Sequence, residues 1–237
     1  MTNLSKSVIV SMNSYTETLV KLFAQTSGKD KLAKILQYGA KLFGYIALRQ
    51  KNKHWMEVMK KLETSSGSAR KVWRLGNTMQ EQQKILQMLR QGNCHQFLNM
   101  LALIRQLGMY FYWVFDNLIW STNIGFTKLD TARLGWYSSI SWLFGLVSSI
   151  IIDMNALSVT LRKEKQLIKD GVDINSDQYV AVLKKKHELY LNCFKNGADS
   201  VIAANLLKIY QTNQGTVGTC GLISAFIGAY QMISVQK

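Results

Sequence analysis

The sequence contains no proline in 237 residues. Proline is the commonest helix stop, because its ring fixes the backbone and its nitrogen has no hydrogen to donate. Long helices are therefore favoured. Apolar residues also recur every three or four positions over residues 15–50, with an interruption at Ser27-Gly28. We expect an all-α fold, a membrane-associated helical bundle with amphipathic N-terminal helices and a hydrophobic C-terminal helix.

Residues 55–77, WMEVMKKLETSSGSARKVWRLGN, are amphipathic when wound as a helix. The apolar stripe consists of Trp55, Met59, Leu62, Ala69, Trp73 and Gly76. Such a helix can lie flat at an anionic bilayer, with its cations among the headgroups. The same pattern also suits a helix that packs into a core, and periodicity does not separate the two alternatives. The run Ser65–Ser68 includes a glycine, which predicts two short helices in solution that become one on lipid.

The positive charge of the chain is concentrated in its first third. Lys and Arg outnumber Asp and Glu by 29 to 14, and residues 29–90 contain 14 cations and 4 anions, or +10 of the total +15. A surplus of this kind suits nucleic acid or an anionic membrane surface. Its coincidence with the amphipathic stretch favours the membrane.

Three later segments are strongly apolar. Residues 97–120 are rich in aromatic side chains, but Arg105 and Asp116 make them a doubtful membrane span. Residues 134–152 are uncharged and suit a span or a buried helix equally. Residues 209–236 are also uncharged, and we expect 217–235 to anchor the chain in a membrane. The small residues expected to pack closely against another helix there are Gly221, Ala225 and Ala229.

These patterns divide the chain into four regions. Residues 1–93 form a basic amphipathic helical region, and 94–160 contain the aromatic-rich hydrophobic helices. Residues 161–187 form a polar connection, and 188–237 contain the C-terminal helices with the anchor candidate.

We find no arrangement of residues that predicts catalysis. The three histidines are far apart, no carboxylate pair is suited to acid–base work, and no cofactor or metal site is expected. Three widely spaced cysteines indicate a reducing compartment. The first 19 residues do not have the features of a secretory or mitochondrial leader. The chain is therefore not expected to be an enzyme.

Several segments resemble the peroxisomal membrane protein 11 (peroxin eleven) family. Leu62-Glu63 followed by RKVWRLGN at 70–77 is similar to the basic amphipathic signature of that family. The segment from Tyr110-Phe111 through Asp116 to Trp120 resembles its Y-F-x-x-x-D-x-x-x-W element. Residues 36–42, Lys195-Asn196 with Asp199, and 218–224 are also similar. Together these segments cover nearly the whole chain in the family's order.

This resemblance implies a protein of the peroxisomal or glycosomal membrane that elongates the organelle and promotes its proliferation and fission. It also implies that the amphipathic helix inserts into an anionic phospholipid membrane. The chain would form homo-oligomers and recruit fission adaptors and a dynamin-like GTPase. The implied lipid-facing residues are Trp55, Met59, Leu62 and Trp73. The implied headgroup-facing residues are Lys60, Lys61, Arg70, Lys71 and Arg74.

Two other functions remain open from the sequence. The first is a solute channel of the peroxisomal membrane, in which Arg105, Asp116 and Asp153 would line the pore. The second is a soluble basic helical protein that binds nucleic acid. The sequence contains no recognisable nucleic-acid recognition module, and the uncharged C-terminal stretch also argues against this second alternative.

Overall fold

The computed structural model describes residue 13, residues 16–93 and residues 95–235. Most of the expectation about the first 19 residues therefore lies outside the described residues. Residues 16–24 are helical and precede seven longer helices. These are α2 (Thr26–Arg49), α3 (Lys53–Trp73), α4 (Asn77–Gln91), α5 (Phe97–Asn123), α6 (Thr131–Lys169), α7 (Asp177–Leu206) and α8 (Gln214–Val235). The described residues contain no strand, which confirms the all-α prediction.

The helices begin and end at residues that satisfy their free backbone groups. The side chains of Asn52, Asp130 and Ser176 accept hydrogen bonds from the first turns of α3, α6 and α7. Gly92 ends α4 with φ +68°, and Gly171 follows α6 with φ +67°. Glycine adopts this left-handed conformation without steric cost, so the chain turns sharply there.

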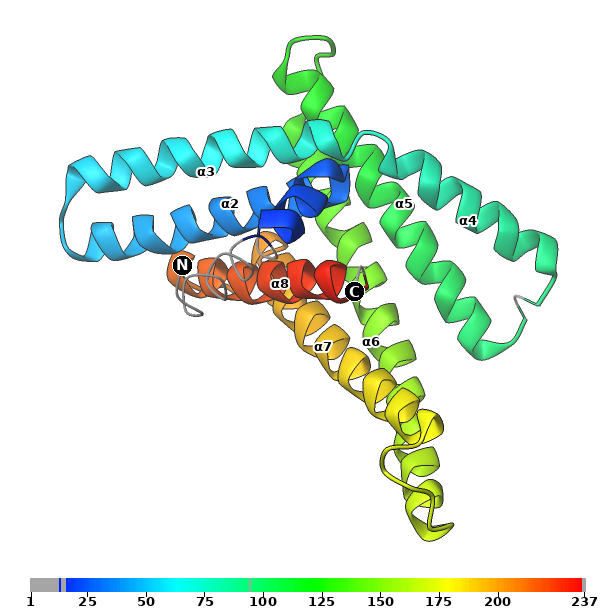
Figure 1. The fold of residues 1–237 in the computed structure, drawn as a ribbon. Helices are drawn as coiled ribbons and strands as arrows, with labels where there is room; N and C mark the ends of the chain where they lie inside the picture. The colour runs from blue at the N-terminus through cyan, green and yellow to red at the C-terminus, as the bar shows by residue number, and fades with distance from the viewer. Residues whose placement is uncertain (1–12, 14–15, 94, 236–237) are drawn as a thin grey trace, which may run out of the picture.

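The helices form two groups that meet at the centre of the molecule (Figure 1). Helices α2 and α3 form an antiparallel hairpin, and α8 packs along α2. The long helix α6 packs against both α5 and α7, and α4 packs against α5. Helix α7 also packs against α8 and so joins the two groups. The end of α3 contacts α5, which makes a second junction between them.

The molecule exposes many large apolar side chains and buries several charged ones. Exposed examples on α5, α6 and α8 are Phe111, Phe144, Ile151, Ile223 and Phe226. The buried charged residues are Asp30, Lys34, Arg70, Arg74, Asp116 and Asp199. In lipid, charged groups turn toward the protein interior and apolar groups turn outward. This distribution therefore favours contact between the surface and a membrane.

Two helices, α6 and α8, are long and apolar enough to cross a membrane. In the most apolar 18-residue stretch of α6, only 17% of the residues are buried, and in the corresponding stretch of α8 the share is 39%. Most of their apolar residues are therefore not used in an intramolecular core.

Two features of the helices differ from the sequence predictions. Helix α3 is continuous through Gly67, because its packing against α2 outweighs the cost of one glycine. The break before α2 lies at Gln25 rather than at Ser27-Gly28. Within the polar connection 161–187, α6 ends at Lys169 and α7 begins at Asp177, so residues 170–176 separate the two helices.

Candidate functional site

Helix α3 turns a polar face toward the protein. The buried residues of the helix are Ser66 and Arg70, and Arg74 is buried directly after it. Glu63 lies on the same face and forms an ion pair with Lys41 of α2 at 2.6 Å. Within the apolar stripe, Met59, Ala69 and Trp73 are half-buried, whereas Trp55 and Leu62 are exposed. Part of the stripe therefore packs against the protein, and both alternatives stay predictions.

Three cations at the end of α3 share two carboxylates in what we call the charge cluster: Arg70, Lys71, Arg74, Asp30 and Asp116. Arg70 Nε lies 2.9 Å from Asp30 Oδ1 on α2. Arg74 Nη2 lies 2.9 Å from Asp116 Oδ2 on α5, and Lys71 Nζ pairs with Asp116 Oδ1. Arg74 Nε is also 3.7 Å from Asp30 Oδ1. The charge cluster therefore joins α3 to both α2 and α5.

Uncharged groups complete this junction. Arg74 Nη1 donates to the Tyr112 hydroxyl at 3.1 Å, and its guanidinium carbon lies 5.2 Å from the centre of the Trp113 ring. The Asn117 amide donates to Thr78 Oγ1 at 2.9 Å. These contacts position the turn after α3 on the surface of α5.

Burial and neighbouring charges shift the pKa values of Asp30, Arg74 and Tyr112 at this junction. Burial acts to raise the pKa of Asp30, but the neighbouring Arg70 and Arg74 outweigh it and lower that pKa overall. Burial acts to lower the pKa of Arg74, yet Tyr112 and the two carboxylates raise it overall. Burial raises the pKa of Tyr112 and keeps its hydroxyl neutral. The charged forms of Asp30 and Arg74 are therefore favoured at this junction.

The outer side of α3 carries apolar and basic side chains together. Trp55 is 53% exposed and Leu62 is 37% exposed. The side chain of Lys60 is 72% exposed, and Lys61 is exposed beside it. Lys60 also lies 3.6 Å from Glu63 Oε2. An exposed tryptophan next to exposed lysines is typical of a helix that lies at a lipid interface.

The structure separates the predicted lipid-binding residues into three groups. Those on the surface are Trp55, Leu62, Lys60 and Lys61. Those that are half-buried are Met59, Trp73 and Lys71. Arg70 and Arg74 are buried, which corrects the expectation that they are surface cations free to meet headgroups. The physical reason is that Asp30 and Asp116, far away in sequence, compensate their charge. The lipid-binding role of the whole set stays a prediction.

Sequence reasoning missed Asp30 and Tyr112 and placed Asp116 in a possible pore. One signal could have linked Asp116 to α3. Asp116 and the segment RKVWRLGN at 70–77 lie in two different motifs that resemble the same family. In the fold, these two motifs meet in the charge cluster.

A second polar junction joins α2 to the C-terminal helices. Lys34 Nζ donates to Asp199 Oδ1 and Oδ2 on α7, at 2.9 and 3.1 Å, and to Ser224 Oγ on α8 at 2.7 Å. Burial lowers the pKa of Lys34 to about 8, although Asp199 acts to raise it. All three side chains are buried, so the contacts connect three helices inside the molecule.

The small residues of α8 lie where that helix packs. Gly221, Ala225 and Ala229 are all buried, and a Cβ at Gly221 would lie 2.0 Å from the Tyr38 ring. At Gly218, a Cβ would lie 2.8 Å from the backbone nitrogen of Leu42. These glycines therefore permit the close approach of α8 to α2.

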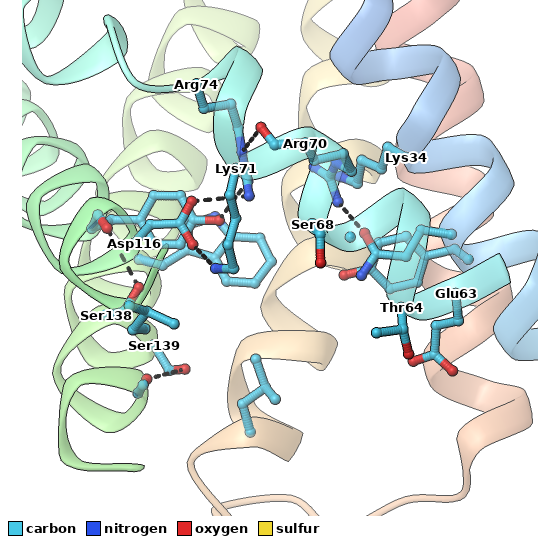
Figure 2. Close-up of a pocket in the computed structure, with 18 of the residues that line it drawn as sticks. Lys34, Glu63, Thr64, Ser68, Arg70, Lys71, Arg74, Asp116, Ser138 and Ser139 are labelled. Atoms are coloured by element: carbon cyan, nitrogen blue, oxygen red, sulfur yellow. Dashed lines mark hydrogen bonds and ion pairs between the residues drawn. The ribbon is translucent and has the colours of Figure 1, made fainter. Parts of the chain in front are cut away.

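A polar cavity of about 520 Å³ opens beside the charge cluster, between α2, α3, α5 and α6 (Figure 2). Basic and hydroxyl side chains dominate its polar lining: Lys34, Arg70, Lys71, Arg74, Thr64, Ser68, Ser138 and Ser139. Thr64 and Ser68 are exposed, so the cavity reaches the surface. Within the described part of the chain, no group of three or more His, Cys, Asp or Glu is arranged to hold a metal ion.

The family model and the similar proteins all indicate the same family. The family model described as Peroxisomal biogenesis factor 11 (PEX11) matches residues 16–233. The chain is 60% identical to the Peroxisomal membrane protein 11 homolog of Dictyostelium discoideum, over 93% of this chain and 95% of the relative. It is 24% identical to Peroxisomal membrane protein 11A of Mus musculus, over 93% and 97% of the two chains. The identity is also 24% to Peroxisomal membrane protein PMP30B of Candida boidinii, over 92% and 94%. No solved structure matches the chain.

Proposed function

Because this chain belongs to the peroxisomal biogenesis factor 11 (PEX11) family, we propose that it remodels the peroxisomal membrane by inserting helix α3 into one leaflet. The protein is a peroxisomal membrane protein, as its relatives are. The specific activity that we propose is elongation of the organelle, which promotes its proliferation and fission. We expect no catalytic activity.

The outer side of α3 is the observation that carries this proposal. Trp55 and Leu62 are exposed, as are Lys60 and Lys61, and the C-terminal end of the helix is fixed by buried ion pairs. A helix held in this way can press apolar side chains into the acyl boundary while its lysines contact anionic headgroups. Each lysine contributes about 1 kcal/mol near such a surface.

Insertion into one leaflet expands that leaflet relative to the other and so favours curvature. The apolar helices α6 and α8 would keep the protein in the membrane while α3 acts at its surface. Self-association would concentrate the effect, and fission adaptors with a dynamin-like GTPase would act on the elongated membrane. These partners are part of the proposal.

The test compares two charge reversals of equal size. Lys60→Glu with Lys61→Glu places repulsive charge on the outer side of α3, and we expect it to abolish tubulation of anionic vesicles while the protein still inserts. Lys165→Glu with Lys169→Glu makes the same change at exposed positions of α6, away from this helix. It is expected to tubulate like the wild type. Equal tubulation by both variants would contradict the proposed role of α3.

A second candidate function is a solute channel, because three polar cavities share lining residues. The cavity beside the charge cluster shares Lys34 with one of about 450 Å³, which shares Lys195 with another of about 640 Å³. Asp116 lines the first cavity, whereas Arg105 and Asp153 line none of the three, contrary to their predicted placement. A conductance in planar bilayers that changes with Lys195→Gln would support this function, and an unchanged one would count against it.

A further inference from the structure

The buried charges at the end of α3 do not balance. In the charge cluster, the three cations Arg70, Lys71 and Arg74 face only the two carboxylates Asp30 and Asp116. The neighbouring charged residues of the cavity are already matched, since Lys34 pairs with Asp199 and Glu63 with Lys41. Among the described residues of the cluster, one positive charge is therefore in surplus. Lys71 is half-buried, and a surplus charge that is partly removed from water is costly unless an anion compensates it.

Unused donor hydrogens remain beside this surplus charge. An ammonium group has three hydrogens to donate, and within the described residues Lys71 pairs with Asp116. Arg70 uses Nε for Asp30 and Nη1 for Gln37, at 2.9 and 2.7 Å, which leaves its Nη2 hydrogens. Both side chains line the polar cavity of about 520 Å³.

Hydroxyl groups surround the same space. Figure 2 shows Ser138 and Ser139 of α6 on one side of Lys71 and Thr64 of α3 on the other. Ser68 of α3 is exposed at the same cavity. Thr64, Ser138 and Ser139 donate their hydroxyl hydrogens to backbone oxygens, which leaves Arg70 Nη2 and the Lys71 ammonium as the principal donors to an anion in the cavity.

We propose that this cavity is a binding site for a phosphate ester, with Arg70 and Lys71 as its principal cationic ligands. The phosphate lies beside the surplus charge, and the cavity has room for the organic group that carries it. The phosphate belongs either to a phospholipid headgroup or to a soluble phosphate ester. The proposal does not depend on membrane bending, because binding to the cavity is measured without vesicles.

The experiment measures the thermal unfolding midpoint of the full-length protein in a non-ionic detergent at constant ionic strength. Glycerol 3-phosphate tests the soluble source, and phosphatidic acid in the micelle tests the lipid source, with sodium chloride and phosphatidylcholine as controls. At several times its Kd, the ligand is expected to raise the midpoint by about 2–4 °C. A shift with either phosphate compound supports the site and identifies its source. No shift with both, or the same shift with the controls, overturns it.

Variants of one position test the charge argument. Lys71→Gln leaves two cations for two carboxylates, so the fold should persist while phosphate affinity falls at least about tenfold, the equivalent of a lost charge-assisted bond. Lys71→Arg keeps the surplus charge and should retain binding. The matched control is Lys169→Gln, which makes the same charge change at an exposed position of α6. Equal losses in Lys71→Gln and Lys169→Gln would contradict the proposed site.

A steric variant tests the cavity without changing any charge. Gly135 of α6 lines the cavity, and a Cβ built there has no neighbouring atom within 4 Å. Gly135→Leu can therefore extend into the cavity without a backbone clash and should abolish binding with the ion pairs intact. If this variant binds phosphate like the wild type, the ligand does not occupy the cavity and the proposal is wrong.

Discussion

The ammonium of Lys34 lies within 3.1 Å of both carboxylate oxygens of Asp199, although 165 residues separate the two in sequence. Both side chains are buried, and the pair joins α2 to α7 at the junction of the two helix groups. The stability of the whole arrangement is therefore expected to depend on this contact.

Removal of one partner should be strongly destabilising. Asp199→Ala leaves the ammonium of Lys34 buried without its carboxylate, and we expect a loss of about 3–5 kcal/mol in the free energy of unfolding. Chemical denaturation in detergent measures this change. Glu188→Ala removes one partner of the exposed pair with Lys185 on α7 and should cost less than about 1 kcal/mol. Similar losses in the two variants would show that the Lys34 pair is not the junction described.

The stability of the protein should depend on pH through Lys34. Its pKa falls from 10.5 to about 8 on folding, so between these values the unfolded chain binds more protons than the folded protein. The contribution of Lys34 is therefore fully present above pH 10.5 and is lost as the pH falls through about 8.

The measurement compares the wild type with the double variant Lys34→Met, Asp199→Leu, which removes both charges. From pH 8 to 10, the wild type should gain stability relative to this variant by up to about 1.4 kcal/mol per pH unit. A relative loss of stability over that range would contradict the lowered pKa.

The exposed lysines of α3 should control electrostatic attraction to lipid. Lys60→Gln with Lys61→Gln removes two charges, worth about 2 kcal/mol together, and should weaken binding to anionic vesicles about 30-fold. Vesicle co-flotation measures the change, and the effect should shrink at high salt because exposed charges are screened. Neutral vesicles should bind both proteins alike. An undiminished affinity for anionic vesicles would place the contact elsewhere.

The approach of α8 to α2 should require a glycine at position 218. A Cβ there would lie 2.8 Å from the backbone nitrogen of Leu42, so Gly218→Ala forces the helices apart and should cost about 1–3 kcal/mol. Gly197 of α7 has no atom within 4 Å of its Cβ position, and Gly197→Ala should instead stabilise the helix by about 0.5–1 kcal/mol. We therefore expect Gly218→Ala to lower the thermal unfolding midpoint and Gly197→Ala to raise it. Equal shifts in the two variants would show that the close contact at Gly218 does not affect stability.

Much of the helical architecture could be predicted from local sequence. Glycine is typical of a helix end, and Gly92 and Gly171 both adopt the left-handed conformation there. The continuity of α3 through Gly67 could not be predicted locally, because it depends on packing against α2, where Gln37 lies close to that glycine. Propensity is a weak guide once tertiary contacts form.

The inner face of α3 could not be predicted from periodicity. A helical pattern assigns Arg70 and Arg74 to the solvent side because charges are assumed to be exposed. Their actual burial depends on Asp30 and Asp116, which lie about 40 residues away on either side in sequence. Only the fold brings these carboxylates to the end of α3.

Helix α6 is longer than a bilayer is thick. At 1.5 Å per residue, its 39 residues extend about 58 Å, whereas the hydrocarbon layer is about 30 Å thick. If residues 134–152 occupy that layer, the remaining C-terminal turns form a rigid stalk with the first half of α7. The stalk would hold the turn at Gly171 more than 20 Å beyond the lipid tails.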